Sequence, residues 1–133
     1  MKVADLMRKD VRTITPDASI ADLVQALADS RISGLPVVNP SGKVVGVVSA
    51  TDVLQAAAEQ GDRKARSTMF EHMTVRDIMS TKPQVIEPDA DARQAAQHML
   101  YTEVRRLFVE DNGRLVGVIS QTDIAHAVGL GRL

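Results

Sequence analysis

A stretch of hydroxyl and carboxylate side chains occurs twice in this chain of 133 residues. Each copy follows a β-branched apolar run and precedes a segment of helical pattern; the two signatures are Gly46-Val47-Val48-Ser49-Ala50-Thr51-Asp52 and Gly117-Val118-Ile119-Ser120-Gln121-Thr122-Asp123. An ionised carboxylate accepts several hydrogen bonds, so Asp52 or Asp123 could hold the two adjacent hydroxyls of a ribose. The side chains that could contact the sugar or a phosphate are Ser49, Thr51, Ser120 and Thr122. Since the helix that starts at each turn also offers free N–H groups to an anion, we expect each turn to bind a small polar ligand.

The same residues have a structural explanation that needs no ligand. A serine followed three residues later by an acidic residue, ahead of an apolar run, is also a helix capping box. However, the signatures share five of seven residues, whereas the amphipathic segments 20–30 and 92–102 share one of eleven. Capping tolerates exchange among Ser, Thr, Asp and Asn, so capping alone does not explain the closer match. Both roles can coexist, and we expect at least one of Asp52 and Asp123 to contact a ligand.

Nearly the whole chain is an internal duplication. Asp5-Leu6-Met7 matches Asp77-Ile78-Met79 at an offset of 72 (77 − 5), and the signatures lie 71 apart (123 − 52). We place the first repeat at residues 1–60, a linker at 61–73 and the second repeat at 74–133. The linker is expected to be a loop followed by a short helix, which docks through Met69, Phe70 and Met73.

Each repeat shows the same β-α-β-β-α order, which predicts an α+β fold with a very short first strand. Apolar residues at helical spacing predict one amphipathic helix per repeat, with core stripes formed by Ile20, Leu23, Val24 and Leu27 and by Ala92, Ala95, Ala96 and Met99. Capping boxes are expected at Ser19 with Asp22 and at Asp91 with Gln94. Two strands follow each helix, joined by a tight turn, and are predicted at 35–38, 43–48, 107–109 and 114–119. A final helix follows each signature.

Composition excludes several classes of protein. The formal net charge is −1 and the chain holds only three aromatic residues, two Phe and one Tyr, so nucleic-acid binding is not expected. The absence of cysteine excludes disulfides and thiolate chemistry. No apolar run approaches the ~20 residues that a membrane span requires, and no signal peptide is visible, so we expect a cytoplasmic protein without a membrane partner.

The sequence contains no arrangement typical of an enzyme. His72, His98 and His126 lie 26 and 28 residues apart, which fits no helical pair of metal ligands. No nucleophile–base pair and no Gly-rich phosphate loop occurs. We therefore expect neither catalytic residues nor a bound metal nor a required cofactor.

The duplicated pattern resembles a pair of CBS motifs (cystathionine β-synthase domains). The segments that carry the resemblance are Asp77-Ile78-Met79, Ser33-Gly34-Leu35-Pro36-Val37-Val38 and the two signatures. The resemblance spans about residues 1–130 and implies a stand-alone pair of β-α-β-β-α repeats, for which we expect no attached enzyme. Two such repeats, related by pseudo-two-fold symmetry, would form one Bateman module.

The resemblance also implies a function. CBS pairs are regulatory modules that bind adenosine-containing ligands such as AMP, ADP, ATP, S-adenosylmethionine or NAD in the cleft between the two motifs. Two pairs commonly associate into a disc-like homodimer, and a protein effector reads the conformational change. Which adenosyl ligand is bound, and which effector responds, is not specified by the residues.

The resemblance assigns further residues to the ligand. Adenine would lie against the strand that follows Ser33, or against its counterpart in the second repeat; the implied residues are Ser33, Gly34, Leu35, Pro36 and Leu107. Thr15 also matches a position that contacts ligand, but its counterpart Glu87 would repel a phosphate. We therefore expect the two clefts to differ. This departure, together with Phe108 in place of Pro36, leaves open a structural protein with a vestigial cleft.

Two arginines stand where the first repeat has Ser33 and Gly34. Arg105 and Arg106 match positions that often face phosphates in CBS pairs, and Arg offers bidentate geometry for them. Because strand side chains alternate, only one of the two can point into a given cleft. The alternative is an exposed edge pair, or salt bridges to Glu103 and Glu110.

Overall fold

The computed structural model describes residues 1–30 and 32–133, without the side chain of Met69. The chain divides into two compact units. Unit 1 consists of Met1–Val11 and Gln84–Leu133, and unit 2 consists of Arg12–Pro83. Among the described residues, no helix combines the length and hydropathy that a membrane crossing requires.

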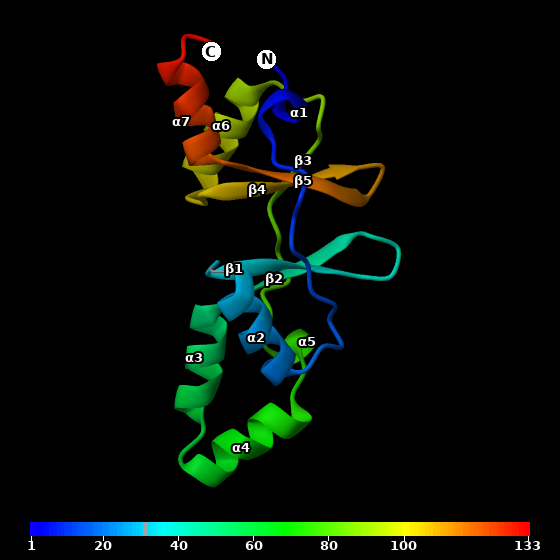
Figure 1. The fold of residues 1–133 in the computed structure, drawn as a ribbon, viewed down its shortest axis with the longest axis vertical. Coiled ribbons are helices and arrows are strands. Elements are labelled where there is room, and N and C mark those ends of the chain that lie inside the picture. The colour runs from blue at the N-terminus through cyan, green and yellow to red at the C-terminus, as the bar shows by residue number, and fades with distance from the viewer. Residues whose placement is uncertain (31) are drawn as a thin grey trace. The chain divides into compact units, whose positions relative to one another are not determined.

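Unit 2 is a two-stranded antiparallel ribbon with helices packed on it (Figure 1). Its elements are α2 (Ile20–Ser30), β1 (Gly34–Val38), β2 (Val44–Ser49), α3 (Ala50–Glu59), α4 (Arg63–His72) and α5 (Val75–Ile78). The first strand of the repeat is reduced to one parallel bridge, between Ile14 and Val37. Phe70 and Met73 pack against Ile20 and Ala56, which confirms that the linker helix docks through them.

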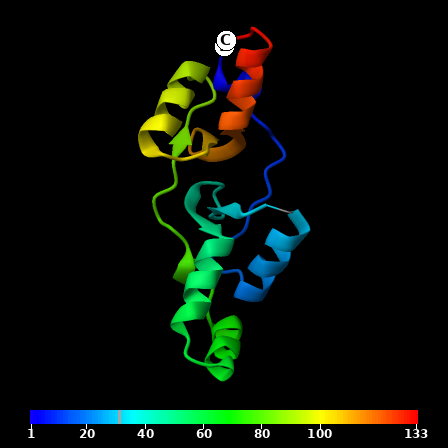
Figure 2. The same ribbon diagram turned by 90° about the vertical axis from the view of Figure 1, so that its left-hand side faces the viewer.

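Unit 1 has the same helix-strand-strand-helix arrangement, but its short helix comes first in the chain and it has no counterpart of α4 among its described elements. Its elements are α1 (Val3–Leu6), β3 (Val85–Ile86), α6 (Ala92–Thr102), β4 (Arg106–Asp111), β5 (Arg114–Ser120) and α7 (Gln121–Gly129). β3 pairs parallel to β4, and β4 pairs antiparallel to β5. Helices α6 and α7 lie side by side on one face of this sheet (Figure 2). The predicted α+β class and the β-α-β-β-α order are therefore confirmed.

Each unit has its own apolar core between helices and strands. In unit 1 the core is formed by Val3, Ala95, Met99, Leu107, Val109, Ile119 and Ile124, and in unit 2 by Leu23, Ala26, Leu27, Leu35, Val37, Val48 and Val75. The predicted stripe of α2 is wrong at one position, because Val24 is 40% exposed and Ala26 is buried instead. Successive helical residues turn by about 100°, so a buried arc centred on Leu23 leaves Val24 at its margin.

Each unit contains the short helix that opens the other repeat in the sequence. Helix α1 opens the first repeat, yet Val3 donates its N–H to the carbonyl of Ala90 in unit 1 (2.8 Å). Helix α5 follows the linker, yet Val75 donates to the carbonyl of Ala18 in unit 2 (2.9 Å). The repeat boundaries drawn from the sequence stay a prediction, whereas the compact units divide the chain after residues 11 and 83.

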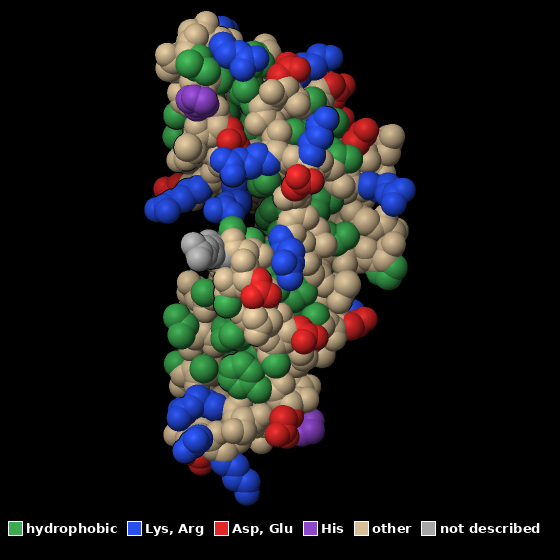
Figure 3. All heavy atoms as spheres, in the orientation of Figure 1, with side chains coloured by type: hydrophobic (Ala, Val, Ile, Leu, Met, Phe, Trp, Pro, Cys, Tyr) green, Lys and Arg blue, Asp and Glu red, His purple; other side chains and the backbone are tan. Residues whose placement is uncertain are grey.

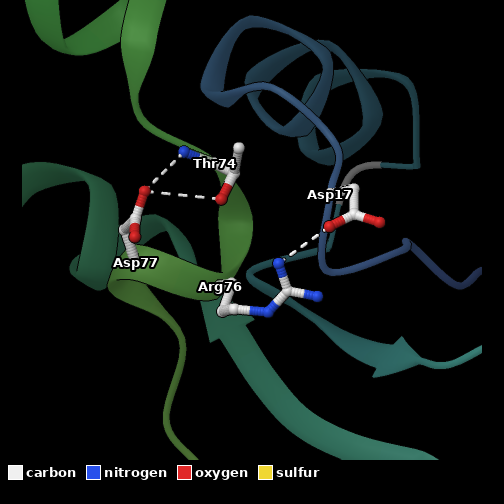
Figure 4. Close-up of polar contacts among 4 residues, drawn as sticks. All are labelled: Asp17, Thr74, Arg76 and Asp77. Atoms are coloured by element: carbon white, nitrogen blue, oxygen red, sulfur yellow. Dashed lines mark hydrogen bonds and ion pairs between the residues drawn. The ribbon is translucent and has the colours of Figure 1, made fainter.

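An exposed ion pair and a backbone hydrogen bond link α5 to the Pro16 corner of unit 2 (Figure 4). Nη1 of Arg76 lies 2.8 Å from Oδ1 of Asp17, and the backbone N–H of Arg76 donates to the carbonyl of Pro16 (2.9 Å). Asp77 turns the other way, and its Oδ2 accepts from the backbone N–H of Thr74 at the start of the helix (2.9 Å). The corner of the first repeat is thus tied to a helix that lies beyond the linker.

The glycine of each signature allows a close approach of two backbones. A Cβ at Gly46 would lie 2.7 Å from the carbonyl oxygen of Ser80, and one at Gly117 would lie 2.8 Å from that of Arg8. These distances are shorter than van der Waals contact, and the atoms involved belong to backbone that cannot rotate away. The segment after each Asp-x-Met motif therefore requires glycine in the strand beside it.

We predict that Gly46→Ala destabilises the fold by about 1–3 kcal/mol, because the added methyl group forces Ser80 away from β2. Urea denaturation followed by circular dichroism measures this change. The control is Gly61→Ala, where a Cβ would meet no atom within 4 Å and the free energy of unfolding should stay within about 0.5 kcal/mol. Equal stability of the two variants would contradict the close approach.

Candidate functional site

The first signature forms a strand-to-helix turn in unit 2. β2 ends at Ser49 and α3 begins at the next residue, so that Ser49 is the N-cap of α3. Oδ2 of Asp52 accepts hydrogen bonds from the backbone N–H (2.7 Å) and hydroxyl (3.0 Å) of Ser49. The N–H of Asp52 donates to Oγ of Ser49 (3.3 Å). The capping box that the sequence allowed is therefore present, and it uses one oxygen of the Asp52 carboxylate.

The second signature forms the same turn in unit 1. Oδ2 of Asp123 accepts from the backbone N–H of Ser120 (2.9 Å), and the N–H of Asp123 donates to Oγ of Ser120 (3.1 Å). In addition, Nε of Arg8 lies 3.5 Å from Oδ1 of Asp123. The Asp123 side chain is only 14% exposed, whereas that of Arg8 is 73% exposed. Both oxygens of this carboxylate thus contact groups of the protein.

Arg8 was not expected at this site from the sequence. It is 115 residues from Asp123 (123 − 8) and belongs to the first repeat, while the turn belongs to the second. The one available signal was the duplication itself, which pairs Met7-Arg8 with Met79-Ser80. That alignment shows a charge difference between the repeats, but it does not show which turn the charge faces.

The strands bring further predicted residues to each turn. In unit 2 the carbonyl of Ser33 accepts from the N–H of Ala50 (2.9 Å), and Gly34 pairs with Ser49. In unit 1 the carbonyl of Arg105 accepts from the N–H of Gln121 (2.9 Å), and Arg106 pairs with Ser120. The same two aligned positions therefore lie beside each turn. They are small and neutral in unit 2 (Ser33 and Gly34) and basic in unit 1 (Arg105 and Arg106).

The side chains of both arginines are exposed. β4 begins at Arg106, so Arg105 lies just before the strand and strict alternation does not apply to the pair. In Figure 3, Lys and Arg side chains gather over the end of unit 1 where β4 and α7 begin. Arg8, Arg105 and Arg106 thus give the Asp123 turn basic neighbours.

Among the described residues, the charged ones that line a hollow beside Asp52 are acidic instead. A hollow of about 210 Å³ opens between α3 and α5, and it is lined by Asp52, Gln55, Ala56, Glu59, Gln60, Met73, Asp77 and Ile78. Three of these side chains are carboxylates and none is basic. In the part of the chain that the structure describes, Asp123 therefore has arginine neighbours and Asp52 has carboxylate neighbours.

Some predicted site residues do not present a side chain to either signature turn. The side chains of Leu35 and Leu107 are fully buried in the cores of their units, so a contact with a ligand would have to come from their backbone. Pro36 is buried as well. Ile14 forms a parallel bridge with Val37, so the next residue, Thr15, lies beside Val38. Val38 is four residues along β1 from Gly34 (38 − 34), or about 13 Å. Within unit 2, Thr15 is therefore not brought to the Asp52 turn.

Comparison with known proteins agrees with the duplicated fold. The chain is 27% identical over 141 residues to the CBS domain-containing protein CBSX1, chloroplastic, of Arabidopsis thaliana, with 90% of the chain aligned. The chain spans 60% of the length of that relative.

Two solved structures are similar over nearly the whole chain. The crystal structure of CBSX2 in complex with AMP is 28% identical, with a TM-score of 0.78 and 97% of each chain covered. The CBS domain pair of protein MJ0100, in complex with 5′-methylthioadenosine and S-adenosyl-L-methionine, is 25% identical, with a TM-score of 0.77, and covers 97% of this chain and 100% of that one.

The sequence model of the CBS domain matches residues 3–59 and 75–130. These two segments include both signature turns and the helices and strands that position them. Since they make up most of the chain, this protein belongs to the CBS-domain family and carries a tandem pair of CBS domains.

Proposed function

We propose that this CBS pair is a regulatory module that binds an adenosine-containing ligand at its signature turns and signals to a protein effector by a conformational change. The observation that carries the proposal is that the two oxygens of the Asp52 carboxylate have different environments. Oδ2 of Asp52 is used by the capping box, whereas Oδ1 has no hydrogen-bond or ion-pair partner in the part of the chain that the structure describes. A ribose hydroxyl can donate to that oxygen without disturbing the helix cap.

The related structures support the chemical class of the ligand. CBSX2 holds AMP, and the MJ0100 pair holds 5′-methylthioadenosine and S-adenosylmethionine. These molecules share an adenosine group and differ in the charge of what is attached to its 5′ carbon. For this chain, AMP, ADP, ATP, S-adenosylmethionine and NAD are the candidates, as regulatory ligands and not as cofactors of a reaction.

We propose binding without catalysis. In the turns, the hydroxyl of Ser49 donates to Asp52. Among the described residues, no Ser or Thr hydroxyl is hydrogen-bonded to a histidine ring: His98 contacts Gln84 instead. These contacts favour a binding module over an enzyme, and turnover assays with the ligand panel test that choice.

We predict that Asp123→Ala weakens binding of an adenosyl ligand at its turn by about tenfold or more, because a hydrogen bond to a charged carboxylate contributes about 1.5–3 kcal/mol. Asp52→Ala should have the same effect at the other turn. Thermal-shift screening with the five candidate ligands identifies the ligand, and isothermal titration calorimetry then measures the affinities.

The matched control is Asp91→Ala, which removes a capping carboxylate from α6, where Oδ1 of Asp91 accepts from the N–H of Arg93 (2.8 Å). It should cost about 1 kcal/mol of stability and leave the affinity unchanged. If Asp123→Ala behaved like this control, with lower stability and intact affinity, the carboxylate would serve only as a cap. A chain stabilised by none of the five ligands would support the alternative of a vestigial site.

We also propose that the chain forms a homodimer through apolar helix faces. Leu54 on α3 is 69% exposed and Val24 on α2 is 40% exposed, and hydrophobic side chains gather over these two helices in Figure 3. In unit 1, Leu100 on α6 is 73% exposed and Val128 on α7 is 56% exposed. Exposed apolar side chains on neighbouring helices are typical of protein–protein contacts.

Leu54→Glu is predicted to weaken self-association at least tenfold, because a buried unpaired carboxylate is costly in an interface. Sedimentation velocity over a concentration series measures this, with Lys43→Glu in the exposed β1–β2 turn as the control. A wild-type chain that stays monomeric throughout the series would refute the dimer.

A further inference from the structure

The backbone of Arg8 is fixed on the edge of β5, beside the second signature. Its N–H donates to the carbonyl of Val118 (2.8 Å), and its carbonyl accepts from the N–H of Val118 (2.9 Å). From this anchored position the side chain reaches Asp123, with Nε 3.5 Å from Oδ1. A guanidinium has five N–H donors, and the side chain is 73% exposed, so the group keeps donors for a second acceptor while it contacts the carboxylate.

Unit 2 contains the same backbone frame without the charge. Ser80 donates to the carbonyl of Val47 (2.8 Å) and accepts from its N–H (2.9 Å), as Arg8 does with Val118. The residue aligned with Arg8 in this frame is therefore a serine. Since the frames match, the two turns differ at this position in the side chain, which is long and charged at Arg8 and short and neutral at Ser80.

The neighbouring residues extend this difference. Arg105 and Arg106 lie against the turn of Asp123, whereas Ser33 and Gly34 lie against that of Asp52. The hollow beside Asp52 adds two further carboxylates, Glu59 and Asp77. A phosphate is attracted by the first set of charges and repelled by the second, whereas an uncharged nucleoside responds to neither.

We propose that Arg8 determines ligand specificity, so that the Asp123 turn selects a phosphorylated adenosyl ligand and the Asp52 turn selects one without a phosphate. This inference rests on the proposed function. Asp123 holds the ribose hydroxyls, and the guanidinium of Arg8 binds the phosphate of the same molecule in the planar geometry that Arg offers to phosphate oxygens. A single chain would then respond to two kinds of adenosyl compound.

The test exchanges the two aligned residues. Arg8→Ser is made in an Asp52→Ala chain, so that ligand binding is measured at the Asp123 turn. Ser80→Arg is made in an Asp123→Ala chain, so that binding is measured at the Asp52 turn. Calorimetric titration with AMP and with adenosine gives both affinities, and melting temperatures show that each variant is folded. Both exchanged side chains are exposed, so neither substitution should prevent folding.

We expect Arg8→Ser to lower the affinity for AMP about tenfold without lowering that for adenosine, because only AMP has a phosphate that can contact the guanidinium. Ser80→Arg should raise the affinity for AMP at the other turn. In chains that keep Arg8, the preference for AMP over adenosine should shrink between 0.05 M and 0.5 M salt, since an exposed guanidinium is screened.

Two outcomes overturn the inference while the proposed function stands. In one, Arg8→Ser lowers the affinities for AMP and adenosine equally, as expected if Arg8 only orients Asp123. In the other, neither exchange changes the affinity for AMP. If the wild-type chain bound neither adenosine nor any of the five candidate ligands, the proposed function would fail, and the specificity of Arg8 with it.

Discussion

The backbone of a short segment lies directly against the glycine of each signature, and the arrangement of both units depends on this contact. A Cβ at Gly46 or Gly117 would come within 2.7 or 2.8 Å of a carbonyl oxygen. The segment is then held by two hydrogen bonds to the next strand residue, Val47 or Val118. Because each segment comes from the start of one repeat and lies against a strand of the other, the contact ties α1 to the second repeat and α5 to the first.

This exchange has a chemical consequence at the turns. In each unit, the residue that follows the methionine of the segment is bonded through its backbone to the strand of the signature, and it comes from the other repeat. In unit 1 it is Arg8, whose Nε lies 3.5 Å from Asp123, and in unit 2 it is Ser80. A duplicated fold with one backbone plan thus carries two turns of different charge. Such a difference arises from substitutions at single positions and leaves the hydrogen bonds of the frame unchanged.

Helix capping and ligand binding are compatible at these turns because a carboxylate has two oxygens. In both units, Oδ2 accepts from the backbone N–H of the N-cap serine, at 2.7 Å in one and 2.9 Å in the other. This bond holds the carboxylate in place before a ligand arrives, so that little side-chain entropy is lost on binding. The second oxygen is the one whose surroundings differ, and it is the one that a ribose hydroxyl would use. The structural role of the signature therefore prepares its proposed functional role.

The sequence by itself determined the duplication, the order of elements and the strand-to-helix turns, because hydrophobic periodicity and capping residues act over a few neighbouring positions. It also identified Ser49, Asp52, Ser120 and Asp123 as partners within each turn, since they lie three residues apart. Only the tertiary structure decided that the units exchange their helical turns, that Val24 is exposed while Leu35 and Leu107 face the cores, and that Arg8 lies at Asp123. These features depend on contacts between segments far apart in the chain. Such contacts form only when the whole chain folds, so no pattern of neighbouring residues predicts them.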